Sequence, residues 1–389
     1  MPYRAGRHFL QIPGPSNVPD RILRAMDQPV IDHRGPEFQA LARRVLARIG
    51  PVFGTTEPIV IFPSSGTGAW EAALVNTLSP GDRVVMYETG HFATLWSRLA
   101  ERLGLRPHLL PGDWRRGARA DAIAEALAAD RAHEIRAVCI VHNETSTGAV
   151  SDVRAVRAAI DEAGHPALLM VDTISGLASV ELRHDDWGID VTVAGSQKGL
   201  MLPPGLGFNA VGPKAREAAR TATLPRSYWD WEPCLDARET GSFPYTPATN
   251  LLYGLDEACA MLAEEGLDAV FARHDRLAEA TRRAVRTWGL DIQCANAAEH
   301  SPVLTGIRMP DGHDADALRA AILERFDMSL GSGLGKVASR MFRVGHLGDF
   351  NDLMLIGTLS GVEMGLAVQQ VPHSRGGVQA AMDYLTGNA

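Results

Sequence analysis

Short apolar runs alternate with amphipathic segments between about residues 50 and 215. The apolar runs predict buried strands at 59–62, 83–87, 137–141, 167–171 and 191–194. The intervening segments predict helices at 69–78, 91–103 and 152–163. Apolar strands separated by helices are typical of a mostly parallel sheet with helices on both faces, so we expect an α/β fold. In such folds ligands bind at the carboxyl ends of the strands.

The pattern changes after about residue 250, where helical periodicity continues with little interruption to residue 288. Beyond it, the pattern predicts strands at 303–308 and 341–344 and helices at 314–326 and 353–368. We therefore expect two domains: a large one over residues 1–260, with an N-terminal segment on the substrate side, and a small α+β domain over residues 261–389. The tail beyond Pro372 contains Gly and Ser and is expected to be loosely held.

Composition and charge narrow the classes of function. The 389-residue chain has a net charge of −8, which argues against a nucleic-acid or anionic-membrane surface. No apolar stretch approaches the ~20 residues of a membrane span, and Met1–Pro13 holds no signal-peptide core, so we expect a cytoplasmic protein. The four cysteines are far apart, which favours buried, reduced thiols over a disulfide framework or a zinc site, and we expect no metal.

Lysine is rare in this chain. Of 38 Lys and Arg residues, only Lys198, Lys214 and Lys336 are lysines. Arg does not deprotonate in proteins, so chemistry that needs a neutral amine must use one of these three. Lys214 is expected at a polar helix start and Lys336 in a glycine-rich loop, both ordinary surface positions. Lys198 follows a predicted strand and precedes an apolar loop, surroundings that lower the pKa of an amine and favour Schiff-base chemistry.

Two further clusters lie at predicted strand ends. In Ser64–Gly68, small residues, hydroxyls and a helix N-terminus can bind an anion, although a plain turn with a Ser cap explains them about equally well. Asp172 ends an apolar strand, where a carboxylate is costly to bury without a cationic partner such as a protonated ring nitrogen. Taken alone, an Asp that caps the next segment is slightly the simpler interpretation. With Lys198, the clusters indicate sites for a phosphate, a pyridinium and an amine at one edge of the sheet.

The identity and order of these motifs resemble the class V, fold-type I aminotransferases, in particular the serine–glyoxylate and alanine–glyoxylate group. The matching segments fall between residue 12 and about residue 348 and are Pro13–Pro19, Ser65–Ala73, His142–Gly148, Val171–Asp172, Gly195–Lys198 and Phe342–Gly345. The resemblance implies a large domain with a seven-stranded type of mostly parallel sheet and pyridoxal 5′-phosphate (PLP) as the cofactor.

The resemblance also implies roles for single residues. Lys198 is expected to carry PLP as a Schiff base and to act as the catalytic base, and Asp172 is expected to pair with the ring nitrogen. The other cofactor contacts that it implies are Ser65, Gly66, Thr67 and Gln197 at the phosphate, Thr145 at the ring hydroxyl, and Ile174 and Phe92 on the ring. For Phe92, an aromatic residue that only fills the core at a helix start is a serious alternative.

Substrate and partner contacts follow from the same resemblance. Arg343 is expected to bind the substrate α-carboxylate through a bidentate fork, and Gly14 to leave room for a small substrate. In relatives, a segment similar to residues 243–247 reaches the phosphate of the neighbouring subunit. Tyr245 and Thr246 are therefore expected cofactor contacts in a homodimer with shared active sites, although a turn anchored by two prolines also explains this segment.

The implied reaction is a ping-pong transamination from a small amino acid to glyoxylate, which gives glycine and a 2-oxo acid. Serine is the preferred donor, followed by alanine. Aspartate stays open, because His33 and Arg34 could offer a cation to a distal carboxylate, although an Arg in a polar loop is usually just solvated. Pyridoxamine, a substrate of some relatives, also stays open.

Three other classes of function fit the sequence less well than an aminotransferase. A PLP-dependent lyase of the desulfurase kind needs a nucleophilic Cys in the C-terminal part, and residues 331–343 contain none. A nicotinamide dehydrogenase is suggested by Gly66-Thr67-Gly68 and by Glu88 twenty residues further on, but Glu71 stands where a third glycine is needed. A non-catalytic binding protein gives no reason for an amine, a carboxylate and a phosphate site together.

Overall fold

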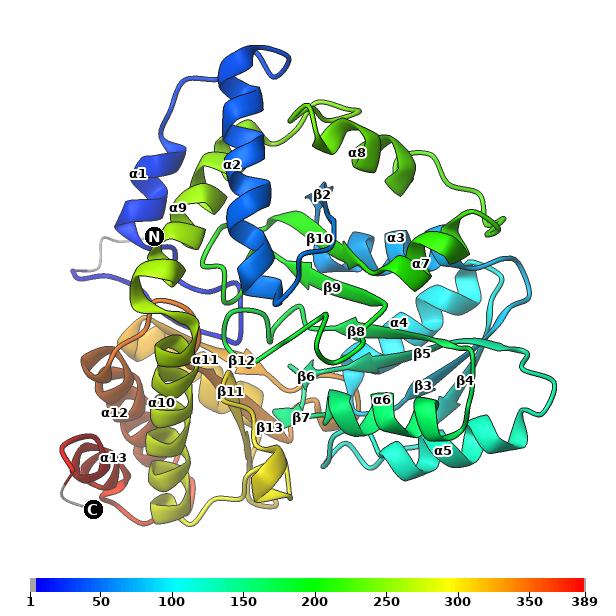
Figure 1. Cartoon of the computed structure of the whole chain (residues 1–389). Helices are drawn as coiled ribbons and strands as arrows, with labels where there is room; N and C mark the ends of the chain where they lie inside the picture. The colour runs from blue at the N-terminus through cyan, green and yellow to red at the C-terminus, as the bar shows by residue number, and fades with distance from the viewer. Residues whose placement is uncertain (1–4, 388–389) are drawn as a thin grey trace.

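A seven-stranded sheet forms the centre of the larger part of the molecule in the computed structural model, which describes residues 5–387 (Figure 1). Its strands, in spatial order, are β2 (Ile59–Ser64), β10 (Gly205–Val211), β9 (Val191–Gly195), β8 (Leu168–Asp172), β5 (Ile135–Val141), β3 (Arg83–Tyr87) and β4 (Arg106–Leu110). Strand β10 is antiparallel to both of its neighbours, and the other adjacent pairs are parallel. The predicted α/β fold with a mostly parallel sheet is confirmed.

Both faces of this sheet are covered by helices, and the side chains of each strand alternate between two cores. In β8, Leu169 and Val171 belong to one core and Leu168 and Met170 to the other. This explains why the strand is a continuous apolar run without polar alternation. The helices of this part are α2 (Pro36–Phe53), α3 (Gly66–Thr77), α4 (His91–Arg102), α5 (Ala120–Ala129), α6 (Val153–Glu162), α7 (Pro213–Ala219) and α8 (Trp231–Arg238).

A smaller sheet of four strands lies beside the larger one, with α10, α12 and α13 gathered around it at the lower left of Figure 1. Its order is β1 (Phe9–Gln11), β12 (Met328–Ser332), β13 (Met341–Gly345) and β11 (Leu304–Arg308). Strand β1 comes from the N-terminal segment and pairs in parallel with β12, so this segment joins the two parts of the molecule. The domain boundary between residues 260 and 261 stays a prediction.

The remaining elements are helices and two short β-strands. They are α1 (Asp20–Met26), α9 (Thr249–Glu265), α10 (Leu267–Trp288), α11 (Ala315–Phe326), α12 (Asp352–Val368), α13 (Gly377–Leu385), β6 (Asn143–Glu144) and β7 (Ala149–Val150). The helix expected to continue to residue 288 is broken at Gly266, whose φ of +83° is open to glycine but not to helical residues.

The expectation of a loosely held tail is wrong for residues 377–385. Helix α13 packs against α10, and Gly377 lies directly on the Trp288 indole. Glu363 connects the two segments, because it accepts hydrogen bonds from Trp288 Nε1 and from the backbone N–H groups of Gly376 and Val378. A Gly- and Ser-containing composition therefore did not indicate mobility in this segment.

Among the helices formed by residues 5–387, none combines the length and the apolar character needed to cross a membrane. The four cysteines are free thiols, of which Cys139, Cys259 and Cys294 are buried and Cys234 is partly exposed.

Candidate active site

The carboxyl ends of β2, β5, β8 and β9 meet at one edge of the large sheet, because these strands are mutually parallel. Ser65 follows β2, Thr145 lies just beyond β5, Asp172 ends β8 and Lys198 follows β9. The clusters predicted from the sequence therefore lie at the same edge of the sheet.

Lys198 is held by the N-terminal segment. Its Nζ donates a hydrogen bond of 2.5 Å to the main-chain oxygen of Pro13. Ser16, in the same N-terminal segment, holds the main chain at Gln197 and Lys198. Its N–H donates to Gln197 O at 3.1 Å and its hydroxyl to Lys198 O at 2.9 Å. Burial lowers the pKa of Lys198 to about 8, and the positive charge of Arg343 acts in the same direction against the opposing effect of Asp172.

Gly14 occupies a position where there is no room for a side chain. A Cβ at this position would come within 2.6 Å of Lys198 Cε and would also overlap Cδ and Nζ of the same side chain. The φ of Gly14 is +99°, a conformation that L-residues rarely adopt. Both observations explain the glycine, and the Lys198 side chain occupies the space that it leaves.

Asp172 is a buried carboxylate with few donors. Its Oδ1 accepts the backbone N–H of Ile174 at 2.7 Å. Burial raises its pKa to about 7, against the lowering effects of this hydrogen bond, of Trp70 and of Lys198. The buried Trp70 ring stacks on that of Trp96 with centroids 5.8 Å apart, and within residues 5–387 its N–H makes no hydrogen bond of good geometry, although it lies close enough to Asp172 to lower the pKa of that carboxyl. A nearby cation would keep this carboxylate ionised.

An anion-binding arrangement lies at the N-terminus of α3. The first N–H groups of a helix have no acceptor within the helix, and the helix dipole favours an anion there. Ser65 and Thr67 are exposed at this point, and Gly66 packs against the Ile174 side chain so closely that a Cβ would clash. The side-chain amide of Gln197 also lies at this edge; its buried Oε1 has no hydrogen-bond partner in the described residues, and only its Nε2 could donate to an anion.

Thr145 is held by a network that sequence reasoning did not anticipate. Its hydroxyl lies 2.7 Å from the Ser175 hydroxyl, which also accepts from Asn143 Nδ2 at 2.8 Å. The adjacent Glu144 is fully buried and accepts hydrogen bonds from both the N–H and the hydroxyl of Ser146. A charged residue beside an apolar strand was the available signal, because such a carboxylate is rarely buried without donors.

Glu144 also connects this loop to α4. Its carboxylate accepts the N–H of Phe92 at 3.4 Å and that of Ala93 at 3.2 Å, at the positive end of that helix. Phe92 is thereby fixed next to the Thr145 loop, and its ring meets that of His91 edge to face at 5.7 Å.

Arg343 is nearly buried on β13 and bridges the two sheets. Its Nε donates to Ser332 O and its Nη1 to Thr145 O, both at 2.7 Å. These two hydrogen bonds use Nε and one N–H of Nη1, so the remaining N–H groups of Nη1 and Nη2 can donate to a carboxylate. Burial lowers the pKa of Arg343 to about 10, so the group stays charged at neutral pH.

Tyr245 and Thr246 are not joined to this cluster within residues 5–387. The Tyr245 hydroxyl donates to Ile61 O at 3.3 Å and contacts Cys234 Sγ at 3.7 Å, and its ring stacks on Tyr228. Thr246 is exposed. The Tyr245 hydroxyl is therefore already engaged inside its own chain.

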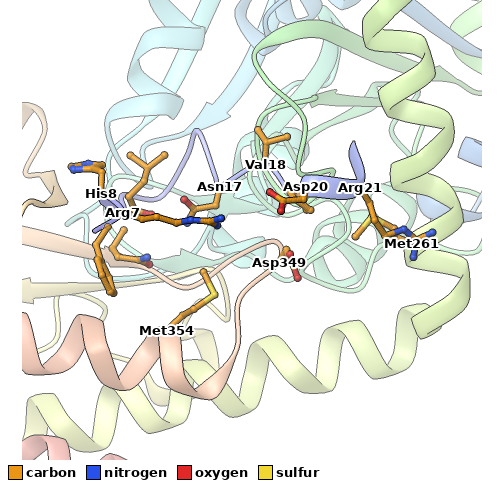
Figure 2. Close-up of a pocket in the computed structure, with 13 residues that line it drawn as sticks. Arg7, His8, Asn17, Val18, Asp20, Arg21, Met261, Asp349 and Met354 are labelled. Carbon is orange, nitrogen blue, oxygen red and sulfur yellow. The ribbon is translucent and has the colours of Figure 1, made fainter. Parts of the chain in front are cut away.

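A groove of about 710 Å³ lies elsewhere, between the N-terminal segment, α9 and α12 (Figure 2). Two of its polar side chains are paired: Arg21 is turned toward α9, where it pairs with Glu257 and Glu264, and His8 bonds to Asp327. None of the residues predicted for the active site lines this groove.

Comparison with known proteins identifies similar chains. The model of the family described as aminotransferase class-V matches residues 8–345. The chain is 48% identical to a serine–glyoxylate aminotransferase of Methylorubrum extorquens, over 99% of this chain and 98% of the relative. It is 44% identical to an L-aspartate–glyoxylate aminotransferase of Paracoccus denitrificans, over 96% of this chain and 95% of the relative. The crystal structure of a ureidoglycine–glyoxylate aminotransferase from Bacillus subtilis superposes with a TM-score of 0.90 at 26% identity, over 99% of both chains.

Proposed function

The chain belongs to the class-V aminotransferases, and from this premise we propose that it transfers the amino group of serine to glyoxylate with PLP held on Lys198. The observation that carries the proposal is the convergence of an amine of lowered pKa, a buried carboxylate and a free helix N-terminus at one edge of the sheet. Alanine follows serine as donor. The acceptor is supported by the relatives, whose names give glyoxylate for both a serine and an aspartate enzyme.

The residues present fit PLP. The first turn of α3 presents N–H groups that have no acceptor inside the helix, beside the exposed hydroxyls of Ser65 and Thr67, and the Gln197 amide can donate to an anion through Nε2. We propose that these groups and Gly66 hold the phosphate. Asp172 fits a ring nitrogen because it is a buried carboxylate whose pKa burial raises, and a cation beside it would keep it ionised. Thr145, Ile174 and Phe92 are proposed to contact the ring. When bound, PLP supplies a ring that withdraws electrons from the substrate α-carbon.

Arg343 and Gly14 are proposed to receive the substrate. The terminal nitrogens of Arg343 bind the α-carboxylate as a fork, held in place by Ser332 O and Thr145 O. A carboxylate bound there would place the α-amino group of the donor on the side of Lys198, whose pKa the charge of Arg343 lowers. The absent side chain at Gly14 leaves Lys198 free to move.

Lys198 Nζ acts as the base. With a pKa of about 8, roughly a tenth of this amine is neutral at pH 7 even before a substrate binds. Once neutral, Nζ accepts the proton of the substrate α-carbon, and its hydrogen bond to Pro13 O marks one position that the amine occupies. An ionised Asp172 would favour the protonated form of the cofactor ring nitrogen, because a negative charge stabilises a positive charge beside it.

A homodimer in the cytoplasm completes the proposal. Thr246 and Tyr245 are proposed to reach the phosphate of the partner subunit; Thr246 is exposed, whereas Tyr245 must first release Ile61 O. The four free cysteines support a reducing compartment, since oxidising compartments favour disulfides.

A donor panel tests the function. Purified enzyme is supplied with PLP and glyoxylate and with serine, alanine, aspartate or pyridoxamine, one at a time, and glycine is measured. We expect glycine with serine at the highest kcat/KM. Aspartate as the best donor would support the runner-up, for which Arg34 on an exposed segment could supply the cation. If no donor gives glycine, the glyoxylate assignment is wrong.

The same panel separates the lyase alternative. A lyase releases product from the amino acid without any 2-oxo acid acceptor, whereas a transaminase stops after one turnover when glyoxylate is left out. Residues 331–343, which run from the end of β12 into β13, contain no Cys that could serve as a nucleophile.

A further inference from the structure

A short loop of the smaller sheet lies across the edge of the larger one. Residues 333–337, which we call the strap, follow β12 and include the 3-10 turn Gly335–Val337. A Cβ on Gly335 would come within 2.8 Å of the Trp114 ring and 3.1 Å of His91 Nδ1, and its φ is +53°. Only glycine lets the backbone lie this close in this conformation. Val337 forms a small buried cluster with Trp114 and Met341.

Lys336 fastens the strap to Glu88, which follows β3. Its Nζ lies 2.5 Å from Glu88 Oε1, and the same oxygen accepts the Trp114 indole N–H at 3.0 Å. The ammonium also lies 5.3 Å from the centroid of the Trp114 ring. Trp114 has a φ of +62°, which is unusual for a bulky residue. Such a conformation persists only where its surroundings hold it, and Gln293 Nε2 donates to its main-chain oxygen at 2.8 Å.

The strap begins next to an anchor of Arg343, the main-chain oxygen of Ser332. Ser332, the last residue of β12, accepts from Arg343 Nε, whereas the other anchor of the guanidinium is Thr145 O in the larger part of the molecule. The direction of the guanidinium therefore depends on how the smaller sheet sits against the larger one. The Lys336–Glu88 contact spans these two parts at the strap.

We propose that Lys336 is a positioning residue for the donor α-carboxylate: it holds the strap on Glu88 and thereby keeps Arg343 between Ser332 O and Thr145 O. The inference rests on the proposed function in one respect, namely that the donor binds Arg343. It gives a role to a lysine that the sequence placed in an ordinary surface loop.

The exposure of Lys336 and Glu88 sets how strongly the loss of their ion pair should change the KM for the amino donor. Ion pairs between exposed side chains contribute little, and the Lys336 side chain is 61% exposed. Glu88 is only 14% exposed and has two donors on one oxygen, so removal of Lys336 leaves a largely buried carboxylate less well compensated. We expect the KM for the amino donor to rise about three- to tenfold.

The test compares three single variants of the PLP-loaded enzyme. Lys336→Met is expected to raise the donor KM about three- to tenfold and to leave kcat within about twofold, and Lys336→Arg to restore most of the KM. The matched control is Lys214→Met, which removes the same charge from a lysine that bonds to Ala167 O. An unchanged KM in Lys336→Met, an equal rise in Lys214→Met or a failure of Lys336→Arg to restore KM would each overturn the proposal.

Hydrogen exchange of the strap provides a readout that is independent of turnover. Residues 333–340 are expected to exchange faster in Lys336→Met and in Glu88→Gln than in the wild type, and at the wild-type rate in Lys214→Met. Unchanged exchange in both Lys336→Met and Glu88→Gln would show that the Lys336–Glu88 contact does not hold the strap. Failure of the proposed function is distinguishable, because it shows in the wild-type enzyme as absence of glycine formation with every donor.

Discussion

The side-chain nitrogen of Lys198 donates a hydrogen bond of 2.5 Å to the main-chain oxygen of Pro13. Pro13 follows β1, which is paired with β12 in the smaller sheet, whereas Lys198 follows β9 in the larger one. The proposed catalytic amine of the larger part is therefore held by a main-chain oxygen of the N-terminal segment, which pairs with the smaller sheet.

Gly14→Ala is expected to lower kcat/KM by more than about tenfold, because the new Cβ overlaps the Lys198 side chain and adds backbone strain. The control is Gly6→Ala, since Gly6 has nearly the same φ, +96° against +99°, but nothing within 4 Å of the added Cβ. Steady-state kinetics of both variants check the prediction. Equal kinetics for the two variants would mean that contact with Lys198 is irrelevant.

Asp172→Asn is expected to lower kcat about a hundredfold, because a neutral amide cannot hold a positive charge on the cofactor ring. Asp190→Asn is a matched control: Asp190 is also buried and accepts a backbone N–H, that of Leu169, at 2.7 Å. Its replacement is expected to affect stability and to leave kcat within about threefold. The measurements are kcat with saturating PLP and the Kd for PLP by fluorescence; native kcat in Asp172→Asn contradicts the assigned role.

Attachment of PLP to the cofactor-free protein is expected to speed up as the pH rises, with a midpoint near pH 8 and a plateau about one pH unit above it. The cause is the lowered pKa of Lys198, due first to burial and then to Arg343, since only the neutral amine attacks an aldehyde. Arg343→Gln should move the midpoint upward, whereas Arg343→Lys keeps the charge and should leave it nearly unchanged. Stopped-flow absorbance across pH 6–10 measures this. A midpoint near 10.5 in the wild type would show that Lys198 is not perturbed.

Stability is expected to fall as the pH decreases from about 6.5 to 4. Burial lowers the pKa of His142, His184 and His274 to about 4 and that of His346 to about 3, so the unfolded chain binds protons that the folded one does not. Asp172, Asp190 and Asp275 work in the opposite sense, because burial raises the pKa of each carboxyl group. Burial also lowers the pKa of His91, His165 and His300, so the histidines outweigh these three carboxyl groups. In His346→Asn the slope should be smaller by about 1.4 kcal/mol per pH unit. Urea unfolding at several pH values provides the test, and a flat profile contradicts it.

Local patterns predicted much of the fold and of the site. The continuous apolar run of 167–171 gave a strand ending beside Asp172, as observed for β8, because strands buried on both faces contain few polar residues. The apolar run of 191–194 likewise predicted the strand before Lys198, which is observed as β9. Roles for single residues came from the resemblance, which rests on the same segments, and they stay predictions until they are tested.

Contacts between distant segments could not be predicted. Lys336 and Glu88 are 248 residues apart in the sequence, and neither has a local pattern that pairs it with the other. The Tyr245 hydroxyl is occupied by Ile61 O, 184 residues away. The break at Gly266 was missed because one glycine within a strong helical pattern is often tolerated.

Borohydride reduction of the PLP-loaded enzyme, followed by peptide mapping, tests the central claim most directly. The chain has only three lysines, so the modified peptide identifies the amine without ambiguity. The account predicts that the yellow colour is lost and that the cofactor is fixed on Lys198 alone, with no fixation in Lys198→Ala. Cofactor fixed on Lys214 or Lys336, or a Lys198→Ala variant that still carries reducible cofactor and turns over at the native rate, would contradict it.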